Sequence, residues 1–540
     1  MCAIAQAFPI GRKLRTLCEN WALCLGRFLL GLLSSIGSNR FVVALSSDAS
    51  VVSPPSPDRG AIDASIRQPV LFFIGSACVW LVAAAALRWL LSVESLFPAD
   101  FGGAAVLSYG RIEAASRMAA IFGWAALAGY GVALWLLARL GGVSVPGWGR
   151  SILFAAAVAW NAALLAGVAA LLGGASTGVE GLELPLRAGG VLWAVQVLLA
   201  VFGAAFFAAR RSGPLYVSQA YLLAALAGFP AVFGLSEAVL AANGAGAGAG
   251  SAQAAALAWF SGALFALWLL PLGLGILYYL LPKVLGRPVE SGGTAWFGFW
   301  SLALIGGWTG GSRLTGGTAP AWVASAGISA HIALLVPGVA VGWNLFPLLR
   351  GRLGSLALRA SPVLRCAAVA LAALVAFQAE GFLTGFRSVG DLVRFTYWEE
   401  ARSAVGLDLF AAMALYGAIY FMAPRLAGWE WPSLRLIRIH FWGAGLGAGF
   451  LVGALATGGL IEGLGVADAR VPFAAVASMT LPFLWMRSAA LLMMLLAQAA
   501  FALHFARLLL RTGPLRAGAG PTLFAVGPHV LTPTPDVPTP

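Results

Sequence analysis

A chain of 540 residues, of which 60% are hydrophobic and 10% charged, is too apolar for an ordinary water-soluble domain. Its formal net charge of +13 would suggest a nucleic-acid partner in a soluble protein, but here the basic residues fall in short loops between apolar stretches. The composition therefore predicts a membrane protein whose main partner is the lipid bilayer, and it excludes nucleic acid.

The five cysteines are scattered along the chain and form no CxxC motif or Cys/His cluster. Cys18 and Cys24 are the closest pair, and no histidine lies beside them. We therefore expect neither a disulfide framework nor a zinc site.

Residues 1–67 differ in character from the rest of the chain. A short apolar piece at residues 21–36 is interrupted by Arg27, and the polar stretch SSDASVVSPPSPDRG follows at residues 46–60. We expect a poorly ordered extension, in which the apolar piece is a signal-like or interfacial segment without a convincing cleavage site. An over-long start-site assignment is the alternative.

Apolar stretches that can each cross about 30 Å of hydrocarbon follow one another after this extension. There are twelve, at residues 69–91, 117–138, 151–173, 189–209, 216–240, 254–281, 294–309, 322–348, 362–385, 403–423, 437–461 and 477–509. They predict an all-α, polytopic domain of twelve transmembrane helices over residues 68–511. The Gly- and Pro-rich tail at residues 512–540 should be disordered.

Lys and Arg concentrate in every second loop, for example at Arg210, Arg211, Lys283 and Arg287, whereas most acids lie in the other loops. Basic residues near the ends of transmembrane helices are retained on the cytoplasmic side. We therefore expect both ends of the helical body to be cytoplasmic.

Several separated motifs occur in one order at consistent spacings. The two longest are YYLLPKVLGRPVESGGTAWFGFWSLALIGGW at 278–308 and AEGFLTGFRSVGDLVRFTYW at 379–398. Shorter ones are LSYGRIEAASRMAAIFGW at 107–124, LYVSQAY at 215–221, PGVAVGWN at 337–344, HFW at 440–442 and WMRS at 485–488. Over residues 69–511 the chain resembles the catalytic subunit I of the cbb-type (C-family) cytochrome c oxidases, in the heme-copper oxidase superfamily.

The resemblance implies twelve helices in three arcs around a low-spin heme b, a high-spin heme b and a copper ion. It also implies a bacterial inner (plasma) membrane and respiratory partners. The family's chemistry depends on six histidines, because neutral imidazole nitrogen ligates both heme iron and copper. This chain has four histidines in total, and none of them matches those six positions.

Other residues stand where the motifs carry the ligands. The low-spin heme positions are Ser116 and Ala404, the high-spin position is Arg402, the copper positions are Gly262, Ser312 and Arg313, and Gly306 replaces the redox-active tyrosine. Glycine and alanine offer no donor atom, and a guanidinium cannot ligate a metal. We therefore expect neither heme nor copper, and no catalytic residue.

Charged residues within apolar spans form a candidate polar cavity, namely Glu380, Asp408, Arg402 and Arg313. Two cations cannot share a dry cavity at low cost, so they must pair with acids, bind an anion or be solvated. For Arg402 we expect Glu399, Glu400 or Asp408 as the acidic partner. The remaining histidines, including His331 and His440, have structural roles in this interpretation.

Loss of two hemes would leave voids that a close-packed interior does not tolerate. We therefore expect side chains and water to fill the former heme volume. The candidates are Arg402, Arg313, Asp408, Arg117, Phe260 and Trp268.

Three hypotheses of function follow. The first is a cofactor-free scaffold or accessory subunit of a respiratory membrane complex, beside c-type cytochrome or other subunits. The second is an active terminal oxidase that transfers electrons from cytochrome c to O2 with proton pumping, through ligands that the sequence does not identify. The third is conduction of a proton or ion through the emptied heme cavities.

Overall fold

The computed structural model describes residues 59–98, 105–211, 215–242, 249–315, 320–350 and 361–516. Within these ranges the chain is helical, and its one strand-like pairing is the isolated antiparallel bridge between Trp429 and Leu515. The predictions for residues 1–58 and 517–540 lie outside the described residues. Among the described residues the first helix begins at Arg59, within the range assigned to the N-terminal extension.

The helices follow the apolar stretches closely. In chain order they are α3 (Arg59–Leu96), α5 (Tyr109–Met118), η2 (Ala119–Ala126), α6 (Leu127–Gly141), α7 (Gly147–Leu172), α8 (Leu186–Ala208), α9 (Val217–Ala242), α10 (Ala249–Leu264), η3 (Phe265–Leu269), α11 (Leu270–Leu285), α12 (Gly292–Ile305), η4 (Gly306–Leu314), α13 (Ala321–Ala333), α14 (Leu335–Leu349), α16 (Pro362–Gly385), α17 (Arg387–Val393), α18 (Tyr397–Ala404), η5 (Val405–Ala411), α19 (Ala412–Ala427), α20 (Leu434–Ala467) and α21 (Phe473–Leu509).

Eleven helical segments of the described chain are long and apolar enough to cross a membrane, where the sequence predicted twelve. The difference lies in the seventh predicted span. There α12 has only 14 residues, and at Gly306 the chain tightens into the nine-residue 3₁₀ helix η4. Glycines at positions 306, 307, 310 and 311 account for this change, because glycine weakens a regular α-helix and allows backbones to approach closely.

Three spans form the centre of the bundle. The most hydrophobic window is 94% buried in the span Tyr109–Gly141, 89% in Ala254–Leu285 and 83% in Tyr397–Ala427, against 39–56% in the others. Each of the three also contains a short segment of π-helix, η2, η3 and η5 respectively. Such segments occur frequently at functional sites. These are three of the four spans in which the motifs locate the missing cofactor ligands.

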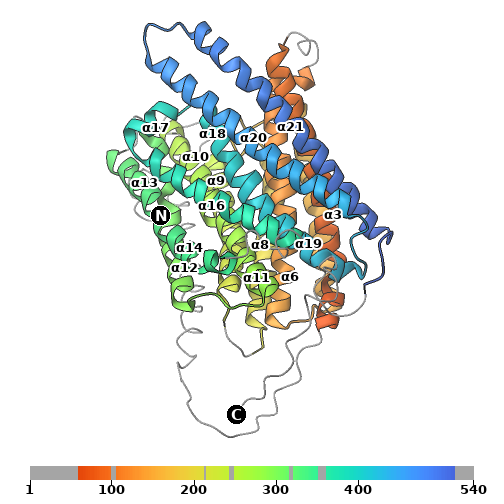
Figure 1. The fold of residues 1–540 in the computed structure, drawn as a ribbon. Coiled ribbons are helices and arrows are strands. Elements are labelled where there is room, and N and C mark those ends of the chain that lie inside the picture. Colours follow the sequence, from red (N-terminus) through yellow and green to blue (C-terminus); the bar gives the residue numbers. More distant parts are fainter. Residues whose placement is uncertain are drawn as a thin grey trace. The chain divides into compact units, whose positions relative to one another are not determined.

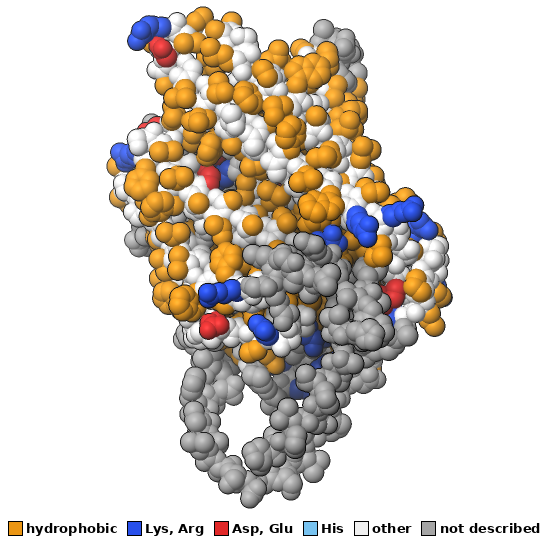
Figure 2. All heavy atoms as spheres, in the orientation of Figure 1, with side chains coloured by type: hydrophobic (Ala, Val, Ile, Leu, Met, Phe, Trp, Pro, Cys, Tyr) orange, Lys and Arg blue, Asp and Glu red, His pale blue; other side chains and the backbone are white. Residues whose placement is uncertain are grey.

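The remaining helices surround this centre (Figure 1). Along one side α21 lies against both α20 and α3, and α3 in turn packs on α6. On the other side η4 packs between α10 and α13, and α16 packs against η5. Hydrophobic side chains are spread over the described part of the face drawn in Figure 2, with few charged ones between them, as expected for helices in contact with lipid. The outer helices thus leave two regions inside the bundle, one beside α3 and α21 and one beside η4 and α16.

Candidate functional site

Ser116 and Ala404, which the motifs place at low-spin heme ligand positions, are both buried. The Ser116 hydroxyl donates a hydrogen bond of 2.8 Å to the carbonyl oxygen of Glu113 on its own helix, so it is engaged locally. Ala404 packs in a hydrophobic cluster with Leu451, Leu455 and Met494, among others. Neither side chain is directed by any polar contact toward a shared ligand.

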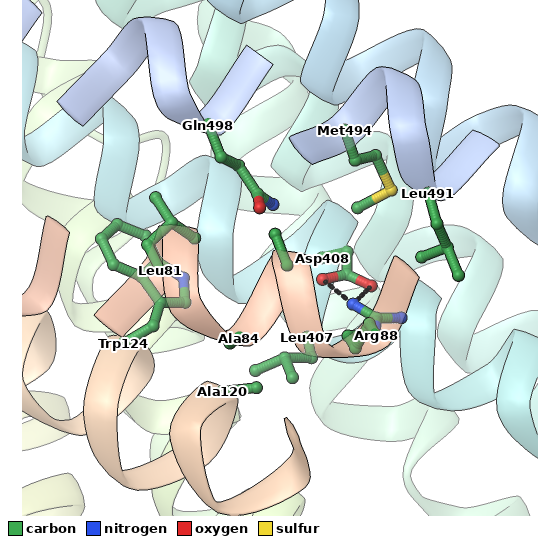
Figure 3. A pocket seen from close by; sticks show the side chains of 11 residues that line it. Leu81, Ala84, Arg88, Ala120, Trp124, Leu407, Asp408, Leu491, Met494 and Gln498 are labelled. Atoms are coloured by element: carbon green, nitrogen blue, oxygen red, sulfur yellow. Dashed lines mark hydrogen bonds and ion pairs between the residues drawn. The ribbon is translucent and has the colours of Figure 1, made fainter. Parts of the chain in front are cut away.

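One helical turn beyond these two positions, η2 and η5 face a small cavity beside α3 and α21 (Figure 3). Across it, Arg88 Nη1 donates to both carboxylate oxygens of Asp408, at 3.0 Å and 2.9 Å. The two side chains retain only 20% and 10% of their exposure, so the pair is largely shielded from water. Asp408 therefore lines this cavity, one helical turn beyond Ala404, and Arg88 neutralises its charge there.

The cavity that remains around this pair is about 20 Å³ in volume. Apolar side chains, including Leu407, Leu491 and Met494, supply most of its lining. Trp124 Nε1 and Gln498 Oε1 are buried beside it and make no hydrogen bond within the described part of the chain. A space of this size with two polar groups can hold about one water molecule, not a macrocycle.

The first former copper position, Gly262, lies against the backbone of η4. A Cβ atom at this position would be 2.5 Å from the Gly310 nitrogen, and one on Gly310 would be 2.2 Å from the Ala258 carbonyl oxygen. Any side chain at residue 262 would therefore require the two helices to separate. The close packing of α10 on η4 therefore depends on the glycines at positions 262 and 310.

A larger cavity of about 220 Å³ lies between η3, η4, α13, α16, α17 and α18. Three of the four predicted polar residues, Glu380, Arg402 and Arg313, line it together, as do the former copper positions Gly262 and Ser312. Asp408 does not line it and belongs instead to the smaller cavity. The predicted polar cavity is thus two separate spaces.

Arg402 is the centre of a hydrogen-bonded network in the larger cavity. Its Nη1 lies 3.3 Å from Glu380 Oε2 and donates to Thr384 Oγ1 at 3.5 Å. Trp398 Nε1 also donates to Glu380, at 3.0 Å. The Arg402 guanidinium lies over the ring of Phe377, 5.1 Å from its centroid. These contacts neutralise the charge of Arg402 and fix the orientation of its side chain. Arg402 stands where the motif has a heme ligand.

His331 of α13 is the one histidine in the lining of this cavity. Its Nε2 contacts Arg402 Nη2, and its Nδ1 lies 3.5 Å from Ser312 Oγ. A guanidinium has donors only, so Nε2 must be the acceptor and the proton of the neutral ring is on Nδ1. The lone pair that would coordinate a metal is therefore already engaged by Arg402.

The prediction that Glu399, Glu400 or Asp408 pairs with Arg402 was wrong. Glu399 pairs with Arg313 at 2.8 Å, and Glu400 pairs with Arg487 at 3.2 Å. Glu380, on α16, is the actual partner. The two adjacent glutamates share a helix with Arg402, but tertiary packing presents other cations to them.

The other three candidates for refilling the heme volume are elsewhere. Arg117 of α5 contacts Glu113 at 2.5 Å and also binds Glu183, which lies in the loop before α8. Trp268 stacks on Phe229 with ring centroids 3.8 Å apart, and Phe260 is buried near Gly181. Of the six candidates, three thus lie away from both cavities, whose volumes are about 20 Å³ and 220 Å³.

Burial raises the pKa of Glu183, against an opposing effect of Arg117. This carboxyl is 5% exposed and lies in the loop before α8. One of its oxygens, Oε2, has no hydrogen-bond partner within the described residues. Arg117 and its acidic partners Glu113 and Glu183 thus form an ionic cluster that is separate from both cavities.

His440 and His504 are engaged in structural contacts. The His440 ring hydrogen-bonds Tyr420 through Nδ1 at 2.8 Å and stacks on Phe501, while His504 Nε2 accepts from the Ser433 backbone at 3.2 Å. In the described ranges no three His, Cys, Asp or Glu side chains converge as a metal site would require. The donor set therefore does not fit two hemes and a copper ion.

Arg88 and Trp398 are site residues that the sequence analysis did not single out. Arg88 lies within the apolar run of α3, so the argument that identified Asp408, a charge inside a membrane span, applies equally to it. Trp398 carries no such signal, because tryptophan is frequent in this chain and only the fold brings it to Glu380.

Comparison with known proteins identifies the family and the fold. A family model for Cytochrome C and Quinol oxidase polypeptide I matches residues 68–493. The chain is 26% identical to cytochrome c oxidase subunit 1 of Rhodobacter capsulatus, covering 78% of this chain and 80% of that protein. It is 32% identical to the cbb3-type cytochrome c oxidase subunit CcoN1 of Stutzerimonas stutzeri over 192 residues, which are 35% of this chain and 40% of the relative.

A solved structure of a heme-copper terminal oxidase dimer has the same fold. It superposes with a TM-score of 0.61 at 13% identity, and the match covers 85% of each chain. With its apolar spans and bacterial relatives, the protein is a multi-pass protein of the bacterial inner membrane. The chain belongs to the cytochrome c and quinol oxidase polypeptide I family, and it resembles the cbb-type subunits within it.

Proposed function

We propose that the chain is a cofactor-free, non-catalytic homologue of cytochrome c oxidase subunit I that acts as a scaffold or accessory subunit of a respiratory membrane complex. Its relatives are named as oxidase subunits, and the superposed structure is a dimeric oxidase. These likenesses support assembly with other respiratory membrane subunits, and the proposal includes c-type cytochrome among them.

One observation carries the proposal. The space one turn beyond Ser116 and Ala404 is occupied by the Arg88–Asp408 ion pair and apolar side chains, and about 20 Å³ remains. A heme there would require these groups to leave, which would expose an unpaired buried charge. The substitutions at the ligand positions and the packing around them are mutually consistent with a protein adapted to the absence of heme.

The active-oxidase alternative has less support. It requires donor atoms for heme iron, and the imidazole nearest to a former high-spin position, His331, accepts a hydrogen bond from Arg402. Met494 lines the smaller cavity without an opposing imidazole. Neither residue offers a free ligand in a space large enough for the group.

A second candidate function, conduction of a proton or ion, is favoured by the larger cavity. It has about 220 Å³ of volume and charged residues on its lining, among them Glu380, Arg402 and Arg313. Charged side chains inside a membrane span commonly mark ion pathways. Flux measured in proteoliposomes, with and without Arg402→Gln, would distinguish conduction from a purely structural role.

The experiment for the scaffold role uses the native membrane. The chain should be purified through a tag with its partners, which are then identified by mass spectrometry, and oxygen consumption should be measured for the complex and for the isolated chain. We expect respiratory subunits to co-purify and the isolated chain to reduce no dioxygen. Oxygen reduction by the isolated chain, or a consistent lack of respiratory partners, would contradict the proposal.

A further inference from the structure

The lining of the larger cavity carries an excess of positive charge. Four arginines, Arg313, Arg387, Arg394 and Arg402, face two glutamates, Glu380 and Glu399, and His331 is a neutral acceptor. Asp391, which is not part of the lining, lies 3.7 Å from Arg394, so one positive charge remains in excess. The acids account for Arg402 and Arg313 by ion pairing at 3.3 Å and 2.8 Å. The excess therefore belongs to the site as a whole.

Donor groups remain available on the paired arginines. Arg402 uses Nη1 and Nη2 in its contacts with Glu380, Thr384 and His331, and its Nε makes no bond within the described residues. Arg313 uses Nη2 alone, and its side chain is 45% exposed. A guanidinium has five N–H donors in a planar fork, which suits a carboxylate or phosphate group.

The guanidinium of Arg402 is held in place by the side chains around it. Glu380 receives hydrogen bonds from both Trp398 and Thr384, at 3.0 Å and 3.3 Å. Phe377 lies under the guanidinium of Arg402 and stacks on Phe265, with centroids 4.0 Å apart. Preorganised donors lose little conformational freedom on binding, which favours affinity.

Positive charge held in a low-dielectric region attracts anions strongly. We propose that the cavity between η4, α16 and α18 is a binding site for a small oxyanion, a phosphate or carboxylate group held by Arg402 and Arg313. The volume of about 220 Å³ lies below the roughly 300–1,000 Å³ of sites for drug-sized ligands, so it fits a group of a few heavy atoms. This inference goes beyond the scaffold role, because a scaffold needs no ligand.

Inorganic phosphate is the probe, titrated calorimetrically into the detergent-solubilised full chain at constant ionic strength set with potassium chloride. We expect one saturable site per chain. Arg402→Gln and Arg313→Gln should each weaken binding about tenfold, equivalent to about 1.4 kcal/mol. Arg313 is the safer variant for folding because its side chain is half exposed.

Two further variants sharpen the result. Glu399→Gln removes the carboxylate that pairs with Arg313, so it should tighten phosphate binding severalfold. Arg150→Gln, at an exposed arginine of α7 away from the cavity, should bind as the wild type does. Opposite signs for the changes at Arg313 and Glu399 would not arise from a general loss of structure.

A lipid headgroup and free phosphate share this chemistry, and nanodiscs separate them. If phosphatidylglycerol in phosphatidylcholine nanodiscs competes with phosphate, the oxyanion comes from a lipid; if it does not, the ligand is a soluble anion, and both results support the site. Absence of saturable phosphate binding by the wild type would overturn the inference. So would unchanged binding in both folded arginine variants. A heme spectrum would test the proposed function separately, so the two can fail independently.

Discussion

Arg88 and Asp408, 320 residues apart in the chain, form a two-point ion pair inside the bundle, with Arg88 Nη1 3.0 Å and 2.9 Å from the two carboxylate oxygens. The pair spans α3 and η5 beside the position where the motifs locate a heme. Because both side chains are largely shielded from water, loss of one partner should lower the stability of the protein.

The first prediction concerns this pair. Asp408→Asn should lower the free energy of unfolding by about 3–5 kcal/mol, because it leaves Arg88 charged and unpaired in a shielded site. The double variant Arg88→Leu with Asp408→Leu should recover most of that loss. Asp468→Asn at the exposed Arg470 pair is the control and should change stability by less than about 1 kcal/mol. Equal effects of Asp408→Asn and the control, measured by denaturation in detergent, would contradict this account.

A second prediction uses two helical glycines. Gly262→Ala should destabilise the protein by about 1–3 kcal/mol, because its Cβ would lie 2.5 Å from the Gly310 nitrogen. Gly449→Ala should stabilise it by about 0.5–1 kcal/mol, because nothing lies within 4 Å of a Cβ there and alanine favours a helix. Thermal midpoints in detergent measure both changes. Tolerance of alanine at position 262 would show that α10 and η4 are not packed as described.

The third prediction concerns pH. Burial raises the pKa of Glu183 above its ordinary value of 4.5, so the folded state binds this proton more tightly than the unfolded state does. Stability should therefore fall as pH rises from about 4.5 to the raised folded pKa, and the contribution should be constant above it. Glu183→Gln should remove this component, whereas Glu180→Gln at an exposed neighbour should not. A pH-independent difference between wild type and Glu183→Gln would be the wrong result.

The fourth prediction concerns orientation. With Cys2, Cys18 and Cys24 replaced by serine, Asp391→Cys should react with a membrane-impermeant thiol reagent in spheroplasts. Arg287→Cys should react only after the membrane is permeabilised. The basic loops should be cytoplasmic, since Lys and Arg are retained there. The two remaining cysteines, Cys78 and Cys366, are buried and give little background. If Arg287→Cys reacted in intact spheroplasts and Asp391→Cys reacted only after permeabilisation, the predicted orientation would be wrong.

Much of the fold could be predicted from hydropathy alone, because a membrane requires long apolar helices whose backbone groups are paired internally. The span 362–385 was predicted with the bounds that the structure has, and most others differ at their ends by a few residues. The exception is the segment after Gly306, where a 3₁₀ helix continues α12. Hydropathy does not predict the 3₁₀ helix, because that helix depends on how closely the glycines let neighbouring backbones approach.

The candidate site could be predicted in part. The residues that stand at the motifs' ligand positions can be read from the sequence, and so can the charges at Glu380, Arg402 and Asp408. Their partners cannot, because Glu380 reaches Arg402 and Arg88 reaches Asp408 only through tertiary packing. Proximity in sequence favoured Glu399, and the structure assigns that carboxylate to Arg313.

The absence of bound heme is the central claim, and a pyridine hemochrome spectrum of the purified full chain tests it most directly. The chain should be expressed in a host that matures cbb-type oxidases, with an authentic cbb-type subunit I purified in parallel as the positive control. We predict no Soret band and no hemochrome from this chain, and copper below stoichiometric amounts. A stoichiometric hemochrome from this chain would contradict the account, and His331 and Met494 would then be the first side chains to replace.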